Sequence, residues 1–189
     1  MGRESRKQNR FTAKRLAMMA LFVALSYAVS WIEIPIVEPF KLDLGNVFIL
    51  LISFLLGPIE GLIVCALKEA LRMIGSASGG VGELANMLMT ASFLLLPSIV
   101  YRFKKGLKWV IPCLAAACII ATGMALFANR FIMFPLYMGV DVMTAEVSMA
   151  FEKSFWVIIL FNLLKTISVS ILTLLLYKRL SNFLKRWEQ

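Results

Sequence analysis

Long apolar runs separated by short polar stretches extend along the whole chain, and they predict helices. The runs lack the two-residue alternation of a β-barrel strand. A helix satisfies its own backbone hydrogen bonds, so helices of this composition can cross a lipid bilayer. Six membrane segments are predicted, at residues 11–32, 45–56, 59–74, 81–101, 109–134 and 154–177.

The second predicted segment, 45–56, is the shortest. At about 1.5 Å per residue it falls well short of a hydrocarbon core of roughly 30 Å. We therefore expect it to belong to a bent element or to be shielded by its neighbours. Gly57-Pro58 predicts a tight break after it. The proline-containing stretch 33–43 before it is long enough for a lid, although a plain connector would suit the sequence equally well.

Composition sharpens this interpretation, because 60% of the 189 residues are hydrophobic and only 16% are charged. Soluble domains are not this apolar. The formal net charge of +9 would suit a nucleic-acid-binding protein, but in such a chain basic residues set the membrane orientation instead. We predict an all-α integral membrane protein with a single domain over residues 1–189, a bundle of six transmembrane helices in a lipid bilayer, with no nucleic-acid partner.

The basic residues gather in three stretches that six spans would place on one side of the membrane. These stretches are the N-terminal tail 1–10, the loop 102–108 and the C-terminal tail 178–189. The loops that fall on the other side, 33–43 and 135–153, carry more acidic than basic residues. Because cytoplasmic loops are rich in Lys and Arg, we expect both termini in the cytoplasm.

The chain has no histidine, and its three cysteines all lie in apolar segments. This removes the commonest general base and metal ligand, so we predict no catalytic residue, no metal and no cofactor. The cysteines predict buried thiols and no disulfide framework. An intramembrane enzyme with Glu83 or Lys165 as the catalytic group is a minor alternative.

Polar side chains inside the apolar segments are few, and they cluster. Such groups are costly in lipid and usually face a bundle interior or a cavity. The candidates are Lys68, Glu83, Asn86, Asn129, Asn162 and Lys165. In the predicted orientation they all lie in the outer half of the membrane, while the inner half is almost wholly apolar. This asymmetry predicts a pocket that is open to the outside and closed to the inside.

The residue types predict a planar, heteroatom-rich and largely uncharged ligand. Asparagine offers both a donor and an acceptor to an imide or pyrimidine edge, and lysine can donate to a carbonyl oxygen. The alternative is a structural network in which Glu83 pairs with Lys68 or Arg72. Glu69 and Arg130 each adjoin a better-placed polar residue, so we expect them to point elsewhere and to serve structural or interfacial roles.

The first predicted helix carries small residues at three- and four-residue steps. They are Ala13, Ala17, Ala20, Ala24 and Ala28. Spacing of this kind lets a second helix approach closely, although alanine is also simply common in helices. This face is therefore a candidate docking surface for a membrane partner.

Several of these motifs together resemble a known family. They are the alanine-lined first helix, KLDLGNVFILLISFLLGPIEGLIVCALKEAL (41–71), GGVGELANMLM (79–89), ANRFIMFPLY (128–137) and FNLLK (161–165). Over nearly its whole length the chain is similar to the substrate-binding S components of energy-coupling-factor (ECF) vitamin transporters. The combination of GELAN, ANRF and FNLLK is more specific, and it is similar to the riboflavin type.

The resemblance implies a six-helix protein of a prokaryotic cell membrane that captures riboflavin from outside with high affinity. It implies a transmembrane coupling subunit and two cytoplasmic ATPases as partners, and the chain itself has no Walker motif. The riboflavin site would include Glu83, Asn86, Asn129, Asn162 and Lys165. The contact with the coupling subunit would include Ala20, Ala24 and Ala28. The remaining alternatives are an S component for thiamine, biotin or a pyridoxine-like compound, and a scaffold subunit without a ligand.

Overall fold

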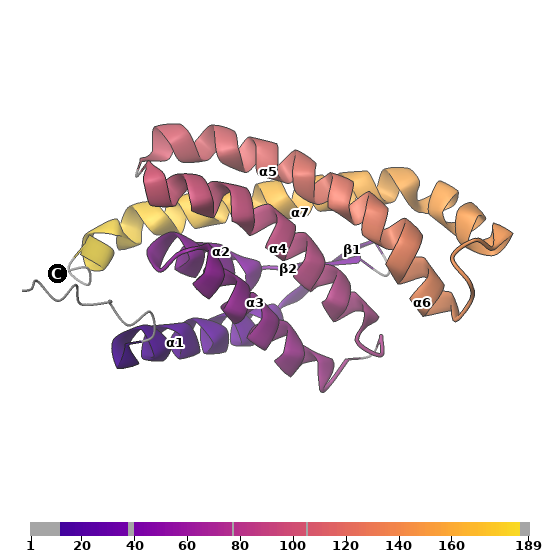
Figure 1. The fold of residues 1–189 in the computed structure, drawn as a ribbon, viewed down its shortest axis with the longest axis horizontal. Coiled ribbons are helices and arrows are strands. Elements are labelled where there is room, and N and C mark those ends of the chain that lie inside the picture. Colours follow the sequence, from indigo (N-terminus) through magenta and orange to yellow (C-terminus); the bar gives the residue numbers. More distant parts are fainter. Residues whose placement is uncertain (1–11, 38–39, 77, 105, 186–189) are drawn as a thin grey trace, which may run out of the picture.

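The computed structural model describes residues 12–37, 40–76, 78–104 and 106–185, and this part of the chain is mainly helical (Figure 1). Its helices are α1 (Ala13–Ser30), α2 (Asn46–Leu55), α3 (Pro58–Met73), α4 (Val81–Phe103), α5 (Leu107–Ala128), the π-helix η1 (Asn129–Met133), α6 (Phe134–Met138) and α7 (Ala145–Lys185). Because α5, η1 and α6 follow one another without a break, the described residues form six continuous helical segments. The prediction of a helical bundle is confirmed.

Within the described part of the chain, four helical stretches are long and apolar enough to cross a membrane. They are Ala13–Ser30, Val81–Phe103, Lys108–Met138 and Ala145–Tyr177. The helix that contains the predicted last membrane segment, 154–177, begins earlier than that segment, because α7 already starts at Ala145. The added turns contain Glu146, Glu152 and Lys153. A search for apolar runs stops at such residues, although glutamate and lysine are good helix formers.

The short helix α2 lies inside the bundle. Eight of its ten residues are buried, and it packs against α1, α3, α4 and α7. Ile49 and Ile52 are completely inaccessible to solvent. The expectation that neighbouring helices shield this segment is therefore confirmed. A helix too short to span a bilayer can be apolar all round when protein covers every side of it.

The stretch before α2 folds as an antiparallel hairpin, which the sequence pattern did not reveal. Strand β1 (Glu33–Val37) pairs with β2 (Phe40–Asp43), with Glu33 opposite Asp43. The register shifts between Pro35 and Val37, since proline cannot donate to the ladder and is confined to edges and irregular positions. The hairpin contacts α7, and its last residue, Asp43, is buried.

An aromatic cluster closes the end of the bundle where α4 finishes. The rings of Phe54, Tyr101 and Tyr177 pack with centroids 5.1–6.3 Å apart. The two tyrosine hydroxyls are hydrogen-bonded to each other. Next to this cluster, Ser98 Oγ on α4 donates to Ser53 Oγ on α2 at 2.7 Å. Three helices that are distant in sequence are thus tied together at one end.

Candidate functional site

Five elements, β2, α2, α3, α4 and α7, bring polar side chains into a buried cluster in the bundle interior. Lys68 Nζ on α3 donates to Glu69 Oε1 at 2.6 Å and also to Asp43 Oδ2 at the end of β2. Lys68 is 0% exposed and Glu69 is 2% exposed. An ammonium group can be buried this deeply because two carboxylates compensate its charge and accept its hydrogen bonds.

Asn86 on α4 connects this ion-pair group to the rest of the bundle. Its Nδ2 donates to Asp43 Oδ2 at 3.0 Å and also to Glu69 Oε1. Its Oδ1 accepts from Asn46 Nδ2 at 3.0 Å and from Lys165 Nζ on α7. We call the six residues the polar cluster: Asp43, Asn46, Lys68, Glu69, Asn86 and Lys165.

The polar cluster corrects two expectations from the sequence. Lys68 pairs with Asp43 and Glu69, and not with Glu83. Arg72, the other proposed partner of Glu83, instead donates to Ser30 O at 2.6 Å. Glu69 was expected to point elsewhere, but the long side chain of Lys68 reaches back to its neighbour and holds it inside the cluster.

The ionisation of Asp43 reflects its surroundings. Burial acts to raise the pKa of this carboxyl group, but attraction and hydrogen bonding by Lys68 outweigh burial. The pKa of Asp43 therefore lies below its ordinary value. The backbone N–H of Gly45 also donates to Asp43 Oδ1 at 2.8 Å, which further favours the carboxylate.

Replacing Asp43 with asparagine should destabilise the protein by about 1–3 kcal/mol, because a charge-assisted bond to buried Lys68 is lost. The melting temperature in detergent measures this, with Asp141→Asn in the exposed loop before α7 as the control. Since the pKa of Asp43 is lowered, its contribution is present at neutral pH and disappears as the pH falls through that pKa. The two proteins should therefore converge in acid, and identical melting at neutral pH would contradict the ion pair.

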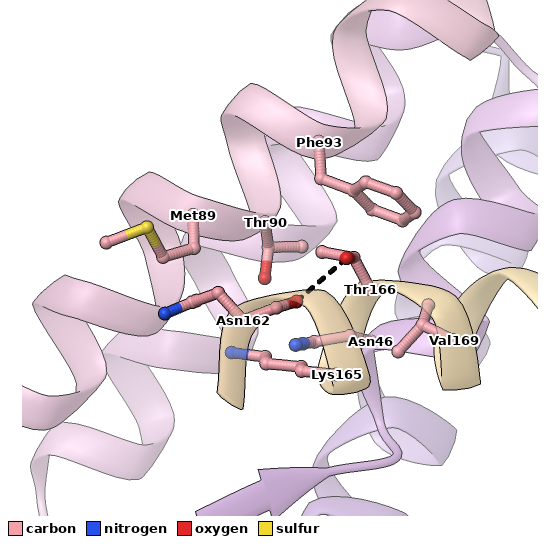
Figure 2. A pocket seen from close by; sticks show the side chains of 8 residues that line it. All are labelled: Asn46, Met89, Thr90, Phe93, Asn162, Lys165, Thr166 and Val169. Carbon is pink, nitrogen blue, oxygen red and sulfur yellow. Dashed lines mark hydrogen bonds between the residues drawn. The ribbon is translucent and has the colours of Figure 1, made fainter. Parts of the chain in front are cut away.

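A small pocket lies beside the polar cluster, between α2, α4 and α7 (Figure 2). Its cavity volume is only about 10 Å³, which is room for about one water molecule. Its lining residues are Asn46, Met89, Thr90, Phe93, Asn162, Lys165, Thr166 and Val169. The pocket therefore combines two amides, two hydroxyls and one ammonium with apolar walls, which is typical of a site for a small organic molecule.

Both asparagines on the later helices are buried and bond to their own helices. Asn162 Nδ2 donates to Ile158 O, and Asn129 Nδ2 donates to Ala125 O, each at 2.8 Å. Asn162 lines the pocket together with Lys165, as their three-residue spacing predicted. Asn129 is the first residue of η1 and does not line the pocket in this conformation.

The π-helix η1 was not predicted. Its first two residues, Asn129 and Arg130, point in different directions and make different contacts. Asn129 is buried, whereas Arg130 reaches sideways to Val142 O at 2.8 Å and to Ser148 Oγ at 3.0 Å. Arg130 thus holds the loop before α7 against the bundle, a structural role of the kind expected from the sequence. Single π turns are frequent at functional sites.

Glu83 lies apart from the polar cluster. Its Oε2 accepts from Ser76 Oγ at 2.6 Å and from Ser78 Oγ at 3.2 Å. These bonds fix the turn between α3 and α4. A role for Glu83 in ligand binding stays a prediction, and in this conformation its carboxylate serves the turn.

The alanine face of α1 points away from the bundle. Ala17, Ala20, Ala24 and Ala28 are exposed, while the helix packs inward through Met19, Phe22, Val23, Ser26 and Ser30. The small residues are therefore not used for packing within this chain. Their contact with a partner stays a prediction.

Sequence reasoning missed several residues of this region, among them Asp43, Asn46 and Thr90. Asp43 was counted only as a loop charge, Asn46 as the start of an apolar segment, and Thr90 was not singled out. For Asn46 a signal was present, since it is an amide at the beginning of a helix that is otherwise wholly apolar. For Asp43 the hairpin had to be known before its burial could be inferred.

An apolar helical bundle with a buried polar cluster and a small polar-lined pocket defines a membrane protein that binds a small molecule. The chain belongs to the family of ECF transporter substrate-specific components, whose sequence model matches residues 14–177. The resemblance found in its motifs is thereby confirmed.

Two relatives support this assignment. The riboflavin transporter RibU of Staphylococcus aureus (strain TCH60) is 37% identical, over 96% of this chain and 97% of that protein. A solved structure, described as "Structure and mechanism of the S component of a bacterial ECF transporter", superposes with a TM-score of 0.76 at 37% identity. The superposition covers 91% of this chain and 98% of that one. These relatives are transporter subunits and not enzymes.

Proposed function

We propose that this protein is the riboflavin-binding subunit of an ECF transporter. The observation that carries the proposal is the 37% identity to a riboflavin transporter over almost the full length of both chains. The chemistry of the pocket supports it independently, because amide and ammonium groups line one side of a largely apolar space. ATP hydrolysis would belong to two cytoplasmic partner subunits, joined to this chain by a transmembrane coupling subunit.

The pocket suits the isoalloxazine ring of riboflavin, which has a polar imide edge and extended apolar faces. Lys165 can donate to a ring carbonyl, and Asn162 can accept from an imide N–H through its Oδ1. Met89, Phe93 and Val169 offer apolar surface to the ring faces. In this structure Lys165 donates to Asn86, so ligand binding would replace this internal acceptor with a ligand carbonyl.

The site must widen to take a flavin. Its cavity volume of about 10 Å³ lies far below the range of about 300–1,000 Å³ that is typical of small-molecule sites. The hairpin β1–β2 is the element we expect to move. Asp43, the last residue of β2, joins it to the polar cluster through hydrogen bonds with Lys68 and Asn86. Of the two roles that the sequence allowed for the stretch 33–43, a lid or a plain connector, we favour the lid, and the ion pair of Asp43 with Lys68 would hold it closed.

The proposed topology has six membrane segments, both termini in the cytoplasm and the pocket open to the outside of a prokaryotic cell. It is supported by the basic residues in the tails and in the loop between α4 and α5. Delivery to the inside would require the loaded protein to tilt in the membrane against the coupling subunit. The exposed alanine face of α1 is the surface that we propose for this contact.

Titration of the purified protein with riboflavin tests the proposal. We expect saturable quenching of flavin fluorescence, and visible flavin absorption bands if the vitamin co-purifies with the protein. Thiamine, biotin and pyridoxine should neither bind nor compete. Tight binding of one of these vitamins without any response to riboflavin would instead indicate an S component of another specificity.

A further inference from the structure

One buried hydroxyl in the pocket wall has no hydrogen-bond partner. Thr90 on α4 is 4% exposed, and its Oγ1 bonds to no group among the described residues. Several other buried hydroxyls donate to the carbonyl four residues earlier, as Thr122 on α5 and Thr166 and Ser170 on α7 do at 2.7–2.8 Å. Thr173 on α7 is the other buried threonine without a partner among the described residues, and it lies outside the pocket lining. Burying a hydroxyl without a partner costs free energy. A physical reason is therefore needed for the unpaired hydroxyl of Thr90.

The position of Thr90 supplies that reason. Figure 2 shows its hydroxyl pointing from α4 toward Asn162 and Lys165 on α7, across the pocket. Its neighbours in the same wall are Met89 and Phe93, which are apolar. Thr90 is thus an isolated polar group, aimed into the site from the side opposite the amide and the ammonium.

We infer that the Thr90 hydroxyl is a specificity-determining contact that hydrogen-bonds to a heteroatom of the bound ligand's ring system. This inference rests on the proposed function. A single hydroxyl in an apolar wall matches the isolated ring nitrogens and carbonyls of a flavin. The ribityl chain carries several hydroxyls in a row and needs several polar partners, of the kind that the polar cluster offers with Asp43, Asn46 and Glu69.

Thr90→Val tests the contact, because valine keeps the shape of threonine and removes the hydroxyl. We expect affinities for riboflavin and for lumiflavin, which has the same ring without the ribityl chain, to fall by a similar factor of roughly three to ten. Thr90→Ser keeps a hydroxyl and should restore most of the affinity. The matched control is Thr173→Val on α7, another buried threonine whose hydroxyl has no partner among the described residues but which does not line the pocket.

Thermal melting of the ligand-free proteins separates binding from stability. Thr90→Val should melt at or above the wild-type temperature, since it removes an unpaired buried hydroxyl; Thr90→Ala is the second variant should valine fail to fold. Unchanged flavin affinity, an equal loss in Thr173→Val, or a loss for riboflavin but not for lumiflavin would each overturn the inference. Wild-type protein that binds neither flavin would instead contradict the proposed function itself.

Discussion

Replacing Lys165 with methionine should lower the affinity for riboflavin by roughly 10- to 100-fold. Lys165 is 7% exposed and lines the pocket. A hydrogen bond to a charged group contributes about 1.5–3 kcal/mol, and each 1.4 kcal/mol corresponds to a factor of ten. Methionine keeps much of the apolar stem, so the loss should come from the missing ammonium rather than from a cavity.

Fluorescence quenching by the purified variants measures this effect. Asn162→Leu should weaken binding as well, because it removes the other polar group that α7 presents to the pocket. Lys108→Met is the matched control, since Lys108 is exposed at the beginning of α5. If Lys165→Met and Asn162→Leu both bind riboflavin as the wild type does, the pocket has been assigned to the wrong residues.

Loss of Lys165 should have little effect on folding, and the hydrogen bonds explain why. The buried carboxylates Asp43 and Glu69 are compensated mainly by Lys68. Lys165 donates to the neutral oxygen of Asn86, which still accepts from Asn46 when Lys165 is gone. The polar cluster thus divides into an ion-pair group that stabilises the bundle and a lysine that is available to a ligand.

The apolar runs were sufficient to predict the helices, because a helix in lipid must be apolar over most of its length. The same rule also made the polar exceptions visible, and these are Lys68, Asn86, Asn162 and Lys165. Each interrupts an apolar run at a depth where a polar group is costly. Local sequence was enough in these cases because the free-energy cost of a polar side chain in lipid depends on that residue and its depth in the membrane.

Other features depended on tertiary contacts and could not be predicted in this way. The burial of Asp43 requires the hairpin to pack against the bundle so that this residue meets Lys68 on α3. The partner of Lys68 could not be chosen among several acids without knowing that fold. Whether a helical threonine bonds to its own backbone, as Thr166 does, or faces a pocket without a partner, as Thr90 does, depends on its rotamer and on the opposite helix.

Replacing Ala24 with tryptophan should abolish riboflavin uptake while leaving riboflavin binding unchanged. Ala24 is exposed on α1, and its helix packs into the bundle through the opposite side, with Phe22 and Val23. A large ring at this position should not disturb the contacts of α1 with the rest of the described fold. It would, however, keep apart two helices whose close approach depends on small side chains.

The comparison that decides this prediction is made in vesicles reconstituted with the complete transporter. Ile119→Trp is the matched control, because Ile119 on α5 is 71% exposed and lies on a different helix. Both variants should bind riboflavin with wild-type affinity, and only Ala24→Trp should fail to transport it. Full uptake by Ala24→Trp would show that the coupling subunit contacts another surface. Equal loss in both variants would show that added bulk anywhere on the lipid-exposed surface impedes transport, and the alanine face would then have no special role.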